Sequence, residues 1–441
     1  MPRAAVPRQP AHCCWKSGTN RSPSPLTAVS KPAPPRHRPN AAQSWPAEQK
    51  RGAHRLLYLG MVVFGMGQTM LFAILPSGGR ALGLNETEIG SVITASAVMA
   101  FLAAPFWGRR SDLWGRKRVV IFGHLAYAIF TALFALGLEL GLNGVLVGFA
   151  AYMALVVPRI LFGMLAMAIH PGSGAYIADS TTPQERTSAS AMLGAAMNIG
   201  TILGPALGAA LATVDLVAPL FVAAAFSAVM TGVIWRRLPE TETLPTAHAV
   251  GRISPRDPRV MPFVLLAFAT FVVAAMVQQT CGFFLQDRLG LDTRTAPRMV
   301  GIALAISAAA SILAQVFVVR RFRLPPLRLI RIGLPLGLAA MILLVLGRDA
   351  ALLLAGYAVM GAALGLLIPG IMSGASLSVR PEEQGRLAGV IGSAPPLGFA
   401  VGPIAGAALY QIQPLLVFCV SAVLLAGFSL YALRLKMPKP S

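Results

Sequence analysis

One segment of this sequence occurs twice. Residues 183–211 read PQERTSASAMLGAAMNIGTILGPALGAAL, and residues 381–409 read PEEQGRLAGVIGSAPPLGFAVGPIAGAAL. The copies align without a gap and share the opening Pro-x-Glu, four glycines, a proline after the third of these glycines, and the final leucine. A repeat in an apolar chain indicates two membrane halves built from one bundle, as in many secondary transporters. The repeat therefore predicts a carrier whose transport path follows the seam between the halves.

The composition places the chain in a lipid bilayer. Hydrophobic residues make up 56% of the 441 positions, charged residues make up 12%, and the mean hydropathy is +0.68. A spanning helix needs about 20 apolar residues, and the sequence supplies about twelve such stretches, the first from residue 56 and the fourth ending at residue 169. The predicted fold class is an all-α integral membrane protein, with twelve transmembrane helices in two pseudo-symmetric six-helix bundles.

Two segments outside these stretches divide the chain. Residues 1–55 contain ten prolines, ten basic residues and one acid, Glu48, which predicts a disordered tail. The tail is interpreted as an extension without a specific role or as the result of a translation start assigned too far upstream. An organelle transit peptide is the alternative. Residues 238–259 are rich in proline and mixed charge and are predicted to form a cytoplasmic linker. The N-terminal bundle is then expected over residues 56–237 and the C-terminal bundle over 260–441.

The net charge of +21 is explained by membrane topology. Basic residues gather in alternate joints between the predicted spans, at Arg109, Arg110, Arg116, Lys117 and Arg118, at Arg236, Arg237, Arg252, Arg256 and Arg259, and at Arg320, Arg321, Arg323, Arg328 and Arg331. This alternation follows the positive-inside rule and predicts that both termini are cytoplasmic. No nucleic acid partner is expected, because a basic groove with stacking aromatics is absent from the sequence. A bacterial inner membrane is favoured, and an organelle membrane is the alternative.

The joint after the second predicted span reads GRRSDLWGRKR over residues 108–118. Gly108 and Gly115 are expected to permit a tight reversal, and Asp112 can form an ion-pair cluster with the five cations around it. This joint resembles the signature loop of the major facilitator superfamily, G-x-x-x-D-[RK]-x-G-R-[RK]-[RK], and departs from it at Leu113. The resemblance implies that Asp112 and Arg116 latch the two halves together on the cytoplasmic side in the outward-open state, with Asp179 as a candidate partner of Arg116. The alternative is that the cluster sets only topology and turn shape.

The repeated segment carries a second resemblance. Gly200, Gly204 and Gly208 recur every four residues beside Pro205, so one helix face is open to the close approach of another helix. The pattern resembles the fifth-helix motif G-x-x-x-G-P-x-x-G of the drug:proton antiporters of the same superfamily, including the tetracycline-efflux-like pumps. The second copy repeats it at Gly398, Gly402, Pro403 and Gly406. A packing role and a role in coupling are both compatible with the pattern.

Arg159 is the one charged residue expected deep within a predicted span. A guanidinium in hydrocarbon is costly, so it is expected to face a water-filled cavity and to be functional. Its position resembles that of the fourth-helix arginine of the antiporters, with Leu155 and Gly163 matching the surrounding pattern. Three interpretations stay open: Arg159 braces the bundle through backbone carbonyls, tunes a proton site, or attracts an anionic substrate group.

No carboxylate is expected well inside a span, although proton-coupled pumps commonly use a buried one whose pKa is raised. The polar positions of the first and seventh spans are held by Gln68, Gln278 and Gln279, which are candidates for coupling or substrate binding. Asp215 and Asp287 are the nearest candidates for a proton carrier, with a solvated helix-end acid as the simpler interpretation.

These observations favour a major facilitator carrier that works by alternating access and exports small lipophilic compounds or drugs by proton antiport. The partners expected are a small-molecule substrate, protons and the bilayer, and a monomer is expected. No cofactor or metal and no enzymatic activity are expected, because no phosphate loop, nucleophile elbow or metal-ligand motif occurs. One alternative is a facilitator or symporter for an organic anion drawn to Arg159. Another alternative is a membrane scaffold that does not transport.

Overall fold

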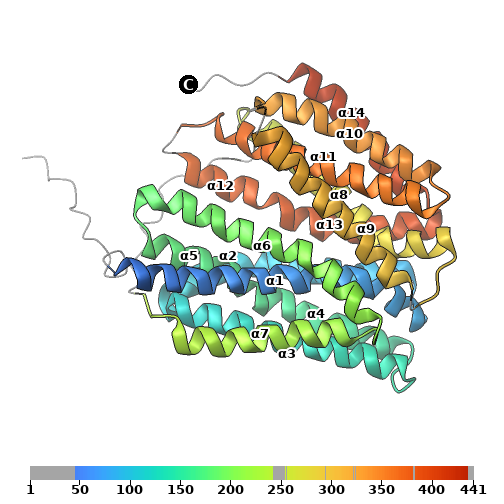
Figure 1. Cartoon of the computed structure of the whole chain (residues 1–441), viewed down its shortest axis with the longest axis horizontal. Coiled ribbons are helices and arrows are strands. Elements are labelled where there is room, and N and C mark those ends of the chain that lie inside the picture. The colour runs from blue at the N-terminus through green and yellow to red at the C-terminus, as the bar shows by residue number, and fades with distance from the viewer. Residues whose placement is uncertain are drawn as a thin grey trace, which may run out of the picture. The chain divides into compact units, whose positions relative to one another are not determined.

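The computed structural model describes residues 45–241, 256–293, 295–320, 324–380 and 383–435, together with Ser254 and Phe322. The predicted tail up to residue 44 and most of the predicted linker lie outside these residues. The described part is helical and has no strand, and twelve of its segments are long and apolar enough to cross a membrane. The predicted all-α membrane fold class is therefore confirmed (Figure 1).

The first six of these spans are called the N-half here. Its helices are α1 (Ala47–Ala81), α2 (Glu86–Trp114), α3 (Arg116–Leu142), α4 (Phe149–Leu165), α5 (Ile169–Ser180), α6 (Pro183–Ala212) and α7 (Ala218–Arg237). A short 3₁₀ turn at Ala166–Ala168 joins α4 to α5, so the two helices form one span.

The last six spans are called the C-half. Its helices are α8 (Met261–Leu289), α9 (Ala296–Leu313), α10 (Pro326–Leu346), α11 (Ala350–Ser376), α12 (Gln384–Gly392), α13 (Ala394–Ile412) and α14 (Leu416–Arg434). A π-helical stretch at Ala314–Arg320 extends α9.

Two helix ends differ from their predicted positions. α1 begins at Ala47 and not at residue 56, and the fourth span continues to Ser180 and not to residue 169. Both extensions contain polar residues, which a hydropathy pattern counts as loop. In α1 these residues have partners within the fold, because Lys50 lies 2.5 Å from Glu185 and His54 lies 2.8 Å from the hydroxyl of Ser180.

The two copies of the repeated segment fold differently at one point. The first copy forms the continuous helix α6, whereas the second breaks at Ser393 into α12 and α13. Pro395 and Pro396 stand where the first copy has Met197 and Asn198. Proline has no backbone N–H and clashes with the preceding helical turn, which accounts for the break.

The repeated glycines pack the fifth span of each half against the first. α6 lies beside α1 in Figure 1, and a side chain at Gly200 or Gly204 would overlap backbone atoms of α1. α13 packs on α8 in the same way, since a Cβ at Gly402 would lie 2.5 Å from Ala275 Cβ and 2.8 Å from the carbonyl oxygen of Val272. Small residues at these positions let two helix backbones approach closely.

The glutamate that the two copies of the repeat share forms an ion pair with the beginning of the first span of its own half. Glu185 pairs with Lys50 near the start of α1, and Glu383 pairs with Arg259, which precedes α8, at 3.2 Å. The hydrogen bond from Lys50 lowers the pKa of Glu185 to about 2, and the one from Arg259 lowers the pKa of Glu383. Both carboxylates are therefore ionised at neutral pH. Each half has an equivalent ion pair, which joins the start of its first span to the start of its repeat segment.

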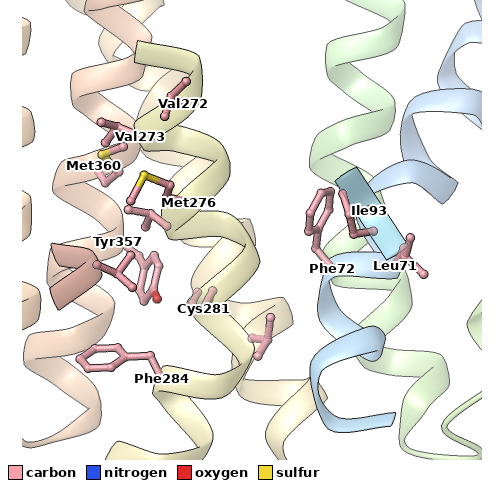
Figure 2. Packing of buried hydrophobic residues seen from close by; sticks show 14 of the residues in the cluster. Leu71, Phe72, Ile93, Val272, Val273, Met276, Cys281, Phe284, Tyr357 and Met360 are labelled. Carbon is pink, nitrogen blue, oxygen red and sulfur yellow. The ribbon is translucent and has the colours of Figure 1, made fainter. Parts of the chain in front are cut away.

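A single cluster of buried apolar side chains includes residues of both halves. Figure 2 shows its C-half part, in which Met276 and Cys281 of α8 lie close to Tyr357 of α11. The N-half contributes residues of α1 and α2, among them Leu71, Phe72 and Ile93. The ring of Phe72 lies 6.2 Å from that of Phe399 on α13, so the halves are in apolar contact.

Candidate functional site

The reversal between α2 and α3 takes place at a single glycine. Gly115 has a φ of +93°, a backbone conformation that favours glycine, and it ends α2 and precedes α3. Gly108 lies inside α2, so the prediction that it shapes the turn is wrong. The helix continues to Trp114, whose ring lies 3.9 Å from the guanidinium of Arg110 and 6.2 Å from the ring of Trp107.

Arg116 lies at the centre of a buried ion-pair cluster. Its Nε donates to Asp179 at the end of α5 over 2.8 Å, and its Nη1 lies 2.5 Å from Asp112 Oδ1 and donates to the hydroxyl of Ser111. The side chains of Arg116 and Asp179 are 2% and 8% exposed. The structure thus brings together the three charged residues named from the sequence. All three belong to the N-half, so their mutual contacts join α2, α3 and α5.

A second cluster joins the halves at the opposite ends of the helices. Arg80, in the last turn of α1, donates from Nη1 and Nη2 to both carboxylate oxygens of Asp287 on α8, over 2.5 and 2.9 Å. Nη2 and Nε of Arg80 also donate to Glu86 of α2, over 2.6 and 3.1 Å. The hydroxyl of Tyr410 on α13 donates to Asp287 over 2.6 Å, and the guanidinium of Arg80 lies 4.9 Å from the ring of Phe283. This set of residues is called the Arg80 cluster below.

Two equivalent helix contacts also join the halves, near the starts of α2 and α9. A Cβ at Gly90 of α2 would lie 2.6 Å from Ala407 Cβ and 2.9 Å from the carbonyl oxygen of Pro403, both on α13. On the other side, a Cβ at Gly301 of α9 would lie 2.7 Å from the carbonyl oxygen of Pro205 on α6. Pro205 and Pro403 are equivalent positions of the repeat. Each half therefore places the Gly-Pro step of its fifth span on a glycine of the other half.

The ion pairs at the Arg116 end of the bundle have a different arrangement. The ion pairs seen there among the described residues each lie within one half: Arg116 with Asp112 and Asp179, Lys50 with Glu185, and Arg259 with Asp257 and Glu383. In the described part of the chain, the ion pair that crosses from one half to the other is Arg80–Asp287. Charge therefore holds the two halves together at the Arg80 end of the described helices.

Arg159 lies in the interior of the N-half. Its residue is 7% exposed, its Nε is buried without a hydrogen-bond partner in the described structure, and its guanidinium carbon lies 4.3 Å from the ring centre of Phe162. The ring of Phe162 contacts that of Tyr127 at 5.0 Å, which in turn contacts Phe64 at 5.8 Å. A bracing role through backbone carbonyls finds no support, because no such hydrogen bond forms with the described residues.

The other polar residues named from the sequence do not lie on α4, the helix that carries Arg159. Gln68 is half-buried on α1, Gln278 is half-buried on α8, and Gln279 is buried with an unpartnered Nε2. Asp215 accepts hydrogen bonds from the backbone N–H groups of Val217 and Ala218 over 2.7 and 3.1 Å. Asp215 therefore caps the start of α7, in line with the simpler interpretation given above.

Sequence reasoning missed the Arg80 cluster as a site. Of its members, only Asp287 was named from the sequence, as a candidate proton carrier. One signal was available: Arg80 and Asp287 carry opposite charges at the same end of the first helix of each half. Equivalent positions in a pseudo-symmetric pair of bundles are candidates for contact across the seam.

Comparison with known proteins identifies the class. The family model described as Major Facilitator Superfamily matches residues 57–394 and, in a second match, residues 293–441. The chain belongs to this superfamily and is a membrane transporter of the two-bundle type.

Two curated relatives are similar over most of their length. Multidrug resistance protein 1 of Bacillus subtilis (strain 168) is 25% identical over 386 residues, which cover 86% of this chain and 95% of the relative. Quinolone resistance protein NorA of Staphylococcus aureus (strain COL) is 22% identical over 369 residues, which cover 81% of this chain and 90% of the relative.

Solved structures share the fold. The human organic anion transporter MFSD10 (TETRAN) superposes with a TM-score of 0.62 at 21% identity. The match covers 88% of this chain and 100% of that chain. A bacterial homolog of the human lysosomal transporter Spinster, in an inward-facing and unoccupied conformation, gives a TM-score of 0.69 at 14% identity and covers 88% of this chain and 98% of that structure.

Proposed function

We propose that this protein exports small lipophilic compounds, drugs among them, in exchange for protons. The names of the two curated relatives support drug export. The observation that carries an alternating-access mechanism is the contact between two related halves, which the Arg80–Asp287 ion pair joins at one end of the helices. Such a carrier has no enzymatic activity, and its energy comes from the proton gradient.

The sides of the membrane follow from the distribution of charge. The Arg116 end of the helices carries Arg109, Arg110, Lys117, Arg118, Arg236 and Arg237, and the positive-inside rule makes this end cytoplasmic. Both termini are then cytoplasmic, and the membrane is a bacterial inner membrane. The Arg80 cluster is then on the outer side, and we assign the described conformation to a state that is closed to the outside.

The two charged clusters have opposite roles in this cycle. The Arg80 cluster closes the outer side in the inward-facing state, because Asp287 brings the C-half onto an arginine that Glu86 holds in the N-half. The Arg116 cluster lies within the N-half in this state. Its role as a latch between the halves belongs to the outward-open state, in which the cytoplasmic ends meet. The Gly-Pro contacts at Gly90 and Gly301 must open together with the Arg80 cluster.

Transport by the purified protein tests the proposed function. In proteoliposomes loaded with a lipophilic fluorescent dye, we expect the dye to move only while a proton gradient is imposed, and a protonophore should stop it. Protein-free liposomes give the passive rate. Movement that equals this passive rate for a panel of anionic, neutral and cationic dyes would exclude drug export. Carrier-mediated movement of the dye that does not depend on the proton gradient would instead indicate a facilitator.

A further inference from the structure

Arg159 is a buried cation without a counter-ion in the described structure. Two part-buried carboxylates on the helices already have basic partners: Asp179 pairs with Arg116, and Asp287 pairs with Arg80. The exposed Glu139 lies near the end of α3. The guanidinium of Arg159 lies over the ring of Phe162, which contacts the ring of Tyr127, and neither side chain is an acid that is ionised at neutral pH in its ordinary range.

An unpaired guanidinium in such a place is costly. Burial of a charge is tolerated in proteins when an opposite charge and hydrogen bonds compensate it. A cation–π contact with one phenyl ring replaces only part of the lost hydration. Arginine offers five N–H donors in a planar fork that fits a carboxylate, a sulfonate or a phosphate. The missing counter-ion is therefore a group that enters with a ligand.

The surroundings also indicate what the rest of this ligand is like. The rings of Phe162, Tyr127 and Phe64 follow one another at 5.0 and 5.8 Å from α4 through α3 to α1. This aromatic path is buried in the N-half, since each ring residue is 1% exposed. Phe64 extends the path to His170, whose ring lies 5.3 Å away at 86°. A ligand whose anionic group reaches Arg159 therefore brings that group into aromatic and apolar surroundings.

We propose that Arg159 binds the anionic group of an amphipathic substrate whose body is aromatic or otherwise apolar. The proposal rests on the proposed export function and narrows its substrates to compounds that carry a carboxylate or a similar anionic group. Arg159 is then a substrate-binding residue, and the charge of the ligand completes a site that the N-half leaves uncompensated.

Equilibrium binding to the purified full-length protein tests this assignment separately from transport. The probes are three radiolabelled naphthalene compounds with the same ring: naphthaleneacetate, which is anionic, naphthaleneethanol, which is neutral, and a naphthyl trimethylammonium, which is cationic. The variants are Arg159→Gln and Arg159→Lys. Arg236→Gln, which removes one exposed charge at the end of α7, is the matched control.

We expect the wild type to bind the anion more tightly than the neutral and cationic probes. Arg159→Gln should weaken binding of the anion by about tenfold or more, as expected for the loss of a charge-assisted bidentate contact. Arg159→Lys should restore part of the affinity, and Arg236→Gln should change nothing. Unchanged binding of the neutral probe shows that Arg159→Gln is folded.

Two results would overturn the assignment. One is equal affinity of the wild type and Arg159→Gln for naphthaleneacetate, and the other is a wild type that binds the cationic or neutral probe but not the anion. In the second case, gradient-driven transport of the cation would leave the proposed export function standing. Failure of this inference and failure of the proposed function are therefore separate results.

Discussion

Replacing Gly204 with leucine is expected to abolish transport. A Cβ at this position would overlap the hydroxyl of Thr69 and the carbonyl oxygen of Met66, so α6 must move away from α1 even for alanine. Overpacking of a close contact between two backbones is expected to cost about 3 kcal/mol or more in stability. The measurement is gradient-driven dye transport in proteoliposomes, together with the thermal unfolding temperature of the purified variant.

The same helix supplies a matched control for this prediction. Gly194 is exposed on α6, and a Cβ there would meet no atom within 4 Å. Gly194→Leu should therefore retain most of the transport activity and the thermal stability. The C-half offers the equivalent pair, with Gly402→Leu expected to be inactive and Gly392→Leu active. Normal transport by Gly204→Leu would contradict the close packing of α6 on α1.

Removing the guanidinium of Arg116 is expected to have the second large effect. Arg116→Met leaves Asp179 buried without its ion-pair partner, and breaking a buried pair in this way typically costs about 3–5 kcal/mol. We expect a marked loss of thermal stability and of transport. Arg118→Met removes an exposed charge from the same turn of α3 and should have little effect.

A second substitution separates the buried charge from a packing effect. Adding Asp179→Asn to Arg116→Met removes the stranded carboxylate, so the double variant should be more stable than Arg116→Met alone. If the two substitutions destabilise the protein additively, the electrostatic explanation is wrong. Transport by the double variant should stay low, because the proposed latch needs the charges and not only the fold.

The sequence was sufficient for the fold because its main signals are local or repeated. Apolar stretches indicated where the spans lie, and the repeat indicated that α6 and α13 are equivalent helices of the two halves. Helix ends were less accurate, since the polar first turns of α1 are stabilised by Glu185 on α6. The break before α13 could have been predicted from Pro395 and Pro396, which the first copy lacks.

The site was predictable only in part. The pairing of Arg116 with Asp179 was expected from the resemblance of the loop to a known family, and the structure places the two side chains in contact. The latch role stays a prediction. The Arg80 cluster was not predicted, because Arg80 and Asp287 are 207 positions apart and meet only when the two halves pack together. The burial of Arg159 and its lack of a carboxylate partner among the described residues agree with the sequence, whereas its contact with the ring of Phe162 needed the structure.

The most direct test of the two-halves account is a distance measured across the outer ends of the helices. Spin labels at Val145 and Arg348, which are exposed and belong to different halves, report this distance in a cysteine-free background. Asp287→Asn removes the charge that holds Arg80 across the seam, and Glu139→Gln removes an exposed carboxylate near the same end as a control. The account predicts that Asp287→Asn shifts the labels toward a longer distance, with the inward-to-outward population ratio changing by about tenfold, while Glu139→Gln matches the wild type. An unchanged distance distribution in Asp287→Asn would contradict the role of the Arg80 cluster in closing the outer side.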